Sequence, residues 1–158
     1  MDSGDLQEWI RSLSRPQPYM LFCDKLREFT PQEFVSLVSD LFRQMGGDTE
    51  IGPVGANGAI DIFLGGDYIV QCKKWKAKVG VATVREVYGA AVKQRAKGAF
   101  IVAVSEFTDA ANNFLIDLPP PTIRLIDGKK LFDLMNQHIP SVVADIQEGI
   151  WKSQKGRD

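Results

Sequence analysis

One acid, one amide and one amine are spaced so that a β-hairpin can bring them together. Asp61 precedes the short segment Gly65-Gly66-Asp67, and Gln71 and Lys73 follow it. If those three residues form the hairpin loop, the register places Asp61 directly across from Gln71. Opposed side chains share a face of the sheet, and so does a residue two positions further along, so Lys73 joins the same patch. A slip of one residue would turn Asp61 to the other face, so the patch depends on this register.

These residue types suit the metal-assisted hydrolysis of a phosphodiester. Mg²⁺ takes oxygen ligands, which here would be the Asp61 carboxylate, the Gln71 amide oxygen and the backbone carbonyl of Cys72; Mn²⁺ is a substitute ion. Such an ion acidifies an attacking water and neutralises charge that develops on the phosphate. Lys73 can orient or activate that water and stabilise the oxyanion. A neutral Gln71 replaces a more usual acid, which weakens metal affinity.

Positive charge is concentrated around and after this patch. The chain carries 19 Lys+Arg and 20 Asp+Glu, for a net charge of −1, but Glu86 is the only acid between residues 72 and 97. The bases of that segment are Lys73, Lys74, Lys76, Lys78, Arg85, Lys93, Arg95 and Lys97. A basic segment of this kind indicates a surface that binds a polyanion such as DNA, whereas a solvated charged helix is the alternative. Its overlap with the polar patch favours DNA.

Within that segment, a helix expected over 80–97 carries a repeating stripe. Arg85, Gly89, Lys93 and Lys97 recur every four residues and therefore share one side of such a helix. Gly89 costs about 1 kcal/mol against Ala in a helix, so its lack of a side chain has a reason: close approach of a phosphate backbone or of another helix. We predict DNA contacts for the residues Lys74, Lys76, Lys78, Arg85, Lys93 and Lys97.

The elements that must position these side chains alternate between helical and strand periodicity. Helices are expected at 4–14, from 31 to the Gly46-Gly47 pair, and at 80–97, 108–116, 129–138 and 141–151, with a turn or two at 19–28. Strands are expected at 50–54, 59–64, 68–75, 99–105 and 122–126. This order implies an α/β domain whose mixed sheet is flanked by helices.

Composition excludes several other classes of protein. A length of 158 residues fits one domain, and two cysteines with one histidine exclude a disulfide framework and a four-cysteine zinc site, and argue against a His-rich metal site. The longest apolar run is far shorter than the roughly 18 residues of a membrane helix, and the acidic N-terminus is unlike a signal peptide. We therefore expect a cytoplasmic protein without a membrane partner.

Four motifs add a resemblance to a known family. They are Gly-x-Asn-Gly-Ala-Ile-Asp-Ile from residue 55, Val-Gln-Cys-Lys-Lys-Trp-Lys from 70, Val-Arg-Glu-Val-Tyr-Gly-Ala from 84 and Leu-Ile-Asp-Gly-Lys-Lys-Leu from 125. In this order they resemble the Mrr-type restriction endonuclease domain, a branch of the PD-(D/E)xK nucleases. The resemblance covers about residues 31–138. It implies a restriction-endonuclease-like three-layer core with a four- or five-stranded mixed sheet, and DNA cleavage with Mg²⁺.

The resemblance also implies roles for individual residues. Asp61 matches the metal-binding Asp, Gln71 and Lys73 match the (E/Q)xK pair, and Glu33 matches an acid on the first core helix. Glu33 has a second interpretation, because it is three residues after Thr30 and completes a helix capping box. The expected organisation is an N-terminal helical extension (1–30), a nuclease-like core (31–138), and a C-terminal helix with a frayed tail (139–158).

The sequence departs from the family pattern in the loop before Asp61. The family often has Asp-Gly-Gly-Ile-Asp there, whereas Asn57 and Ala59 replace the first Asp and the second Gly. The sequence predicts a Mg²⁺-dependent DNA endonuclease that leaves a 5′-phosphate. The alternatives are a catalytically weak or inactive DNA-binding module of the same fold and a resolvase selective for DNA junctions. Cutting both strands requires two active sites, so we expect a homodimer, for which the N-terminal helix is one candidate contact.

Overall fold

A five-stranded mixed sheet forms the centre of the protein. The structure is a computed structural model, and it describes residues 3–13, 17–53 and 58–151. The strand order is β1-β2-β3-β4-β5, with antiparallel pairing from β1 to β3 and parallel pairing from β3 to β5. The strands are β1 (Thr49–Ile51), β2 (Ile62–Leu64), β3 (Tyr68–Lys73), β4 (Gly98–Ala103) and β5 (Thr122–Ile126). The predicted α/β class with a mixed sheet is confirmed.

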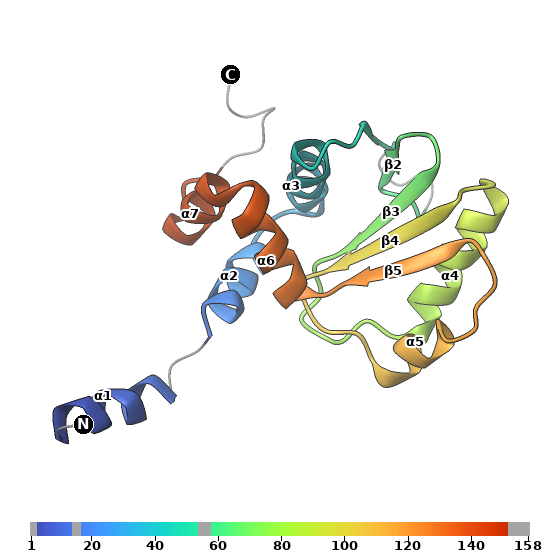
Figure 1. Cartoon of the computed structure of the whole chain (residues 1–158). Coiled ribbons are helices and arrows are strands. Elements are labelled where there is room, and N and C mark those ends of the chain that lie inside the picture. The colour runs from blue at the N-terminus through green and yellow to red at the C-terminus, as the bar shows by residue number, and fades with distance from the viewer. Residues whose placement is uncertain (1–2, 14–16, 54–57, 152–158) are drawn as a thin grey trace.

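Helices cover both faces of the sheet, which gives the three expected layers (Figure 1). On one side are α2 (Pro18–Arg27), α3 (Pro31–Gln44), α6 (Gly128–His138) and α7 (Pro140–Glu148). On the other side are α4 (Val81–Lys93) and α5 (Asp109–Phe114). The N-terminal helix α1 (Ser3–Leu13) stands apart from these layers.

The two faces of the sheet bury different kinds of side chain. The α3 face contains a large cluster with several aromatic rings, including Phe22, Phe34 and Phe42. The α4 face contains smaller residues, including Ala91, Ala99, Ala103 and Ala111. Because side chains alternate along a strand, Val70 points into the α3-side cluster and Ile69 into the α4-side cluster. The position of Gln71, two residues after Ile69, therefore places it on the α4 side.

The hairpin between β2 and β3 has the predicted register. Leu64 pairs with Tyr68 and Ile62 with Val70. The turn needs two residues with positive φ, and Gly65 and Gly66 supply them at φ 64° and 78° without a Cβ penalty. The paired residues of β2 begin at Ile62, and Asp61 lies directly before it.

Several element boundaries differ from the sequence-based expectation. The second strand begins at Ile62 instead of residue 59, because Gly58 and Ala59 form a turn. The first strand runs over 49–51 instead of 50–54, and β3 ends at Lys73 instead of residue 75. The expected turn or two at 19–28 is a ten-residue helix, α2.

The most consequential boundary is the end of α4, at Lys93 instead of Lys97. Arg95 has a positive φ of 55°, and the Ala96 N–H donates to the Ala91 carbonyl at 2.9 Å. This is the hydrogen bond of a Schellman motif, which ends a helix with a left-handed residue. Lys97 therefore does not belong to the helical stripe that includes Arg85, and the predicted four-membered stripe is wrong at that position.

The predictions for the loop before Asp61 and for the C-terminal tail fall on residues that the structure does not describe. Asn57, in the loop before Asp61, and the tail 152–158 lie outside the described residues. Within the described ranges, no helix has the length and apolar character needed to span a membrane.

Candidate functional site

The backbone of Asp61, directly before β2, makes one hydrogen bond toward β3 and one toward β1. Its N–H donates to the carbonyl of Val70 at 2.8 Å, although Val70 is the register partner of Ile62, so the pairing is offset by one residue at Asp61. Its carbonyl accepts from the Gly52 N–H at 2.9 Å, on the side of β1. Two backbone hydrogen bonds therefore fix the direction of the Asp61 side chain before its carboxylate makes any contact.

The Asp61 carboxylate binds two groups of β3. Its Oδ2 accepts from the Cys72 backbone N–H at 2.7 Å and from Gln71 Nε2 at 3.0 Å. The same Gln71 nitrogen donates to the Cys72 carbonyl at 3.2 Å. The predicted meeting of Asp61 and Gln71 across the hairpin is confirmed, and the Cys72 carbonyl lies in the same cluster.

The side chain of Gln71 is buried and only half satisfied. It is 4% exposed, and its Oε1 has no hydrogen-bond partner among the described residues. Both neighbours of the amide, Asp61 Oδ2 and the Cys72 carbonyl, are acceptors, so the network assigns the nitrogen to their side and leaves the oxygen over. A buried unpaired acceptor costs free energy. An oxygen of this kind is a suitable ligand for a cation.

Burial also disfavours the charge on Asp61. Desolvation raises the pKa of the Asp61 carboxyl above its ordinary value, and the Cys72 N–H and the charge of Lys73 act in the opposite direction with smaller effect. A divalent cation would offset the desolvation of this carboxylate. The electrostatics and the unpaired Gln71 oxygen therefore point to the same kind of ligand.

Lys73 ends β3 next to this cluster. Its Nζ lies 4.4 Å from the centroid of the Trp75 ring, a distance at which an ammonium is attracted to an aromatic face. The charge of Lys73 also reaches Asp61, since it lowers the pKa of that carboxyl. Sequence reasoning missed the role of Trp75, although a ring two residues after the lysine was a signal that both could lie on one side of the chain.

Glu33 is occupied at the start of α3. Its Oε1 accepts from the Thr30 N–H at 2.8 Å, and Thr30 Oγ1 accepts from the Glu33 N–H at 3.1 Å. This reciprocal pair is the predicted capping box, and it is confirmed. The charge of Lys73 lowers the pKa of Asp61, against the larger effect of burial.

The candidate metal ligands include a single acid. No group of three His, Cys, Asp or Glu side chains suited to a metal occurs in the described part of the chain. Burial raises the pKa of the Cys72 thiol, and that side chain packs against the α3-side cluster, so the thiol is structural. The donor set is one carboxylate, one amide oxygen and one backbone carbonyl, which fits a hard ion that keeps several waters.

The predicted DNA-contacting lysines are spread over more than one side of the molecule. Lys74 Nζ donates to the Arg27 carbonyl at the end of α2, at 3.4 Å. Lys97 lies 3.6 Å from Asp67 of the hairpin, at the opposite end of β3 from Lys73. The structure therefore turns the Lys74 side chain toward the end of α2 and places Lys97 at the other end of β3.

Other basic residues lie around the end of β3 and along α4. Lys78 is 3.5 Å from Glu106, and both Lys76 and Lys78 line a cavity of about 500 Å³ that also involves α2 and the start of α6. The Arg85 guanidinium lies 5.5 Å from the Phe114 ring. Lys93 is exposed in the last turn of α4. A Cβ at Gly89 would meet nothing within 4 Å, so helix packing does not explain this glycine.

Comparison with protein families decides the ancestry of this fold. The model of the Mrr_cat family, described as "Restriction endonuclease", matches residues 26–135. The chain belongs to the Mrr family of restriction endonucleases. It thus contains a restriction-endonuclease-type nuclease domain, and the predicted family is confirmed. No curated protein sequence matches the chain.

A solved structure of a restriction endonuclease shares the fold. The DNA modification-dependent restriction endonuclease AspBHI is similar with a TM-score of 0.60 and 14% sequence identity, over 86% of this chain and 40% of that protein. MspJI, solved in complex with a 27-mer oligonucleotide, has a TM-score of 0.44 and 14% identity, over 94% of this chain and 35% of that protein. The chain therefore spans less than half the length of either structure.

Proposed function

We propose that this Mrr-family domain is a Mg²⁺-dependent DNA endonuclease that hydrolyses phosphodiester bonds and leaves a 5′-phosphate. The observation that carries the proposal is the cluster of Asp61, Gln71 and the Cys72 carbonyl at the end of β3, with Lys73 beside it. Membership of the family supports the class of reaction. The hydrogen bonds and the burial of the cluster support the choice of these residues as the active site.

Three groups of the protein would hold the ion. The terminal nitrogen of Gln71 lies 3.0 Å from Asp61 Oδ2 and 3.2 Å from the Cys72 carbonyl. Oxygen donors grouped in this way would suit a hard divalent ion that keeps several waters. Turning the Gln71 amide would present its unpaired oxygen in place of the nitrogen. The ion, when bound, supplies Lewis acidity and lowers the pKa of a bound water.

The remaining residues position the water and the substrate. Lys73 is the group that holds or orients the attacking water and stabilises the developing oxyanion, and the Trp75 ring limits where its ammonium can lie. We assign Glu33 a supporting role in the reaction from the start of α3, where its Oε1 accepts from the Thr30 N–H. Lys74, Lys76 and Lys78 follow Lys73 within five residues along the chain, and we assign them contacts with the DNA backbone.

A plasmid-cleavage assay tests the proposal directly. Supercoiled DNA is incubated with the protein and Mg²⁺ or Mn²⁺, using the wild type, Lys73→Ala and the matched control Lys129→Ala on α6. We expect cleavage by the wild type and the control and a loss of at least a hundredfold in Lys73→Ala, the usual range for a residue that moves a proton. Equal rates for the two lysine variants would contradict the role of Lys73.

The same assay separates the alternatives. Salt-sensitive DNA binding without cleavage in either metal would mean a non-catalytic DNA-binding module, since phosphate contacts alone give that salt dependence. Faster cleavage of four-way junctions than of linear duplex would mean a junction resolvase. The raised pKa of Asp61 and the unpaired oxygen of Gln71 favour the enzyme, because a module that only binds DNA has no need of a desolvated carboxylate.

A further inference from the structure

Trp75 is an exposed tryptophan next to the candidate site. Its side chain is 47% exposed, and in the described part of the chain it belongs to neither buried cluster and has no aromatic ring packed against it. The contact that the ring does make is with the Lys73 ammonium, 4.4 Å from its centroid. Exposure of a large apolar ring costs free energy, and packing within the described residues does not offset that cost. The ring is therefore available to a ligand.

The loop that carries Trp75 is anchored to the segment that follows β4. Ser105, which is 7% exposed, donates from its Oγ to the Ala77 carbonyl at 2.8 Å. The Val79 N–H donates to the Glu106 carbonyl at 2.9 Å. The ring thus stands between the end of β3 and a loop whose backbone is held in place. A ring presented in this way loses little conformational freedom when a ligand binds to it.

Basic residues flank Trp75 along the chain. Lys73, Lys74, Lys76 and Lys78 lie within three residues of it, and the sequence has no acid from residue 72 to residue 85. Proteins that bind unpaired nucleic acid combine cations, which attract the phosphates, with aromatic rings, on which the bases stack. The charges around Trp75 therefore favour a nucleobase of DNA as the occupant of the ring.

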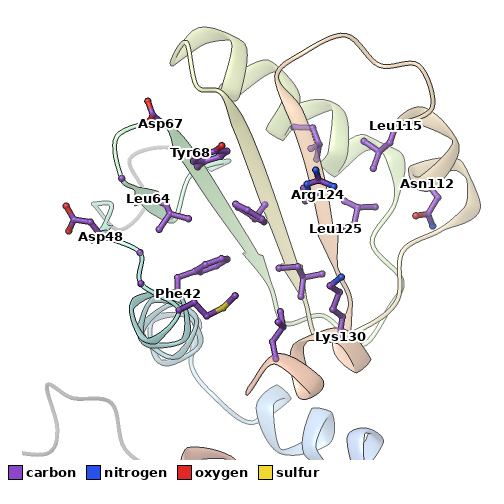
Figure 2. Close-up of a pocket in the computed structure, with 18 residues that line it drawn as sticks. Phe42, Asp48, Leu64, Asp67, Tyr68, Asn112, Leu115, Arg124, Leu125 and Lys130 are labelled. Atoms are coloured by element: carbon purple, nitrogen blue, oxygen red, sulfur yellow. The ribbon is translucent and has the colours of Figure 1, made fainter. Parts of the chain in front are cut away.

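The opposite end of β3 has a second exposed aromatic ring, and it differs in both respects. Tyr68 is 39% exposed, but its ring packs against Phe100 with the centroids 5.9 Å apart. Figure 2 shows Tyr68 beside Asp67 at a groove of about 960 Å³. Packing accounts for this ring, and the neighbouring carboxylate repels phosphate. Of the two rings, Trp75 is the one whose surroundings suit DNA.

A base can stack on Trp75 only if one of its faces is free. In a paired duplex the neighbouring base pairs cover both faces, so stacking on a side chain first requires that the base leave the helix. This cost is small for a base that is already unpaired, at a mismatch, a bubble or a single-stranded overhang. Because Lys73 contacts the same ring, a base on Trp75 lies one side chain away from the proposed catalytic lysine.

We propose that Trp75 stacks on an unpaired base next to the cleaved bond, so that the domain prefers DNA with locally unpaired nucleotides over a fully paired duplex. The inference rests on the proposed function, since it takes DNA as the substrate of this site, and it names the class of DNA. Lys73 contacts the ring from the side of the catalytic cluster, and the base occupies the exposed part of the ring.

Binding measured in EDTA tests the preference without cleavage. A fully paired duplex and the same duplex with a short central mismatch are titrated with the full-length wild type, Trp75→Ala, Trp75→Phe and the control Trp9→Ala, whose ring is 57% exposed on α1. We expect the wild type and the control to bind the mismatched DNA at least tenfold more tightly than the paired DNA, the effect of stacking one base. Trp75→Phe should keep most of this preference, and Trp75→Ala should lose it.

The preference between the two DNAs separates stacking from a role through Lys73. Trp75→Ala should bind the paired duplex as the wild type does, because that DNA has no free base for the ring. Equal loss of affinity for both DNAs would mean that Trp75 acts only by holding Lys73, and it would overturn the proposal. A wild type without the preference, or a Trp75→Ala variant that retains it, would also overturn the proposal.

Quenching of tryptophan fluorescence reports the stacking itself. The chain has three tryptophans, and in Trp9→Phe the remaining rings are Trp75 and Trp151. Trp151 is 8% exposed and stacks on Phe29, with 4.8 Å between the centroids, so it is shielded from DNA. Oligo(dT) should quench the emission of Trp9→Phe and should leave that of Trp9→Phe/Trp75→Phe unchanged. Equal quenching in both variants would contradict stacking on Trp75.

Cleavage of the same two DNAs with Mg²⁺ distinguishes failure of this inference from failure of the proposed function. Tight binding of the mismatched DNA that depends on Trp75, without cleavage of either DNA, would contradict the nuclease and support the stacking. Cleavage of both DNAs at equal rates, with equal binding, would support the nuclease and overturn the stacking. We expect faster cleavage of the mismatched DNA, at bonds next to the mismatch.

Discussion

Two acids of this protein were predicted to work in one site, and the two regions that hold them differ in nearly every physical respect. Glu33 lies at the start of α3, where its carboxylate is bound to a backbone N–H three residues away. Asp61 lies directly before β2, and its partners belong to β3 and stand ten and eleven residues along the chain. Desolvation raises the pKa of Asp61, whereas Glu33 sits at a helix start that itself favours negative charge.

The difference teaches how a structural acid can be told from a chemical one. A capping carboxylate is satisfied by local backbone donors and stabilises the fold when it is charged. Asp61 is charged against the cost of burial, and its neighbour Gln71 keeps an unpaired oxygen. Both the buried charge of Asp61 and the unpaired oxygen of Gln71 cost free energy, and a bound cation would reduce both costs.

The sharpest test of this comparison is Asp61→Asn. Removing the charge of the proposed metal ligand Asp61 should lower the cleavage rate by at least a thousandfold, while the folded protein keeps or gains stability because the buried charge is gone. Plasmid cleavage and thermal unfolding measure the two effects. Asp67→Asn, in the exposed hairpin, is the matched control and should keep full activity. Loss of folding in Asp61→Asn would show that Asp61 is structural after all.

A second test adds a charge where the site now has a neutral oxygen. Gln71→Glu should raise the affinity for Mg²⁺ or Mn²⁺ at least tenfold, because a second carboxylate faces the ion, and should lower stability without metal, because two carboxylates then share a buried site. Calorimetric titration with Mn²⁺ and thermal unfolding with and without the ion measure both. Gln94→Glu, at the exposed end of α4, should change neither. Unchanged metal affinity in Gln71→Glu would remove Gln71 from the ligand set.

The capping box gives the converse prediction for Glu33. Thr30→Ala should cost about 1 kcal/mol of unfolding free energy, because the Glu33 N–H loses its acceptor. Glu33→Gln should cost less than that and lower the cleavage rate less than tenfold. Urea denaturation and the plasmid assay separate these effects. A large rate loss in Glu33→Gln with normal stability would place Glu33 beside Asp61 as a catalytic acid and would end the contrast between the two regions.

The smallest expected effect is on the pH dependence of stability. Since the pKa of Asp61 is raised in the folded state, the native protein holds this proton at a pH where the unfolded chain has lost it. The contribution of Asp61 to the unfolding free energy therefore falls as the pH rises from its ordinary pKa of 3.8 through the raised native value. The stability of Asp61→Asn relative to wild type should increase over the same range. Parallel curves for the two proteins would contradict the desolvation of Asp61.

Much of the candidate site could be predicted from the sequence because it depends on local spacing. The glycine pair of the hairpin loop and the period of two along the strands fix the pairing of β2 with β3, which brings Asp61, directly before β2, within hydrogen-bond distance of Gln71. The capping box is likewise local, because Thr30 and Glu33 are three residues apart. By contrast, the stripe ending at Lys97 failed, because an ideal period of four assumes a helix that the Schellman motif ends at Lys93.

The sequence by itself determined the family, the layered fold and the hairpin partners, since each follows from motifs or periodicities along the chain. Only the tertiary structure decided how much water reaches Asp61, that the Cys72 N–H binds its carboxylate, that Gln71 Oε1 is left without a partner, and that Lys74 turns toward α2. The physical reason is that burial and pairing depend on which distant segments pack together. Hydrogen-bond vacancies and desolvation are properties of that packing, and no spacing along the chain encodes them.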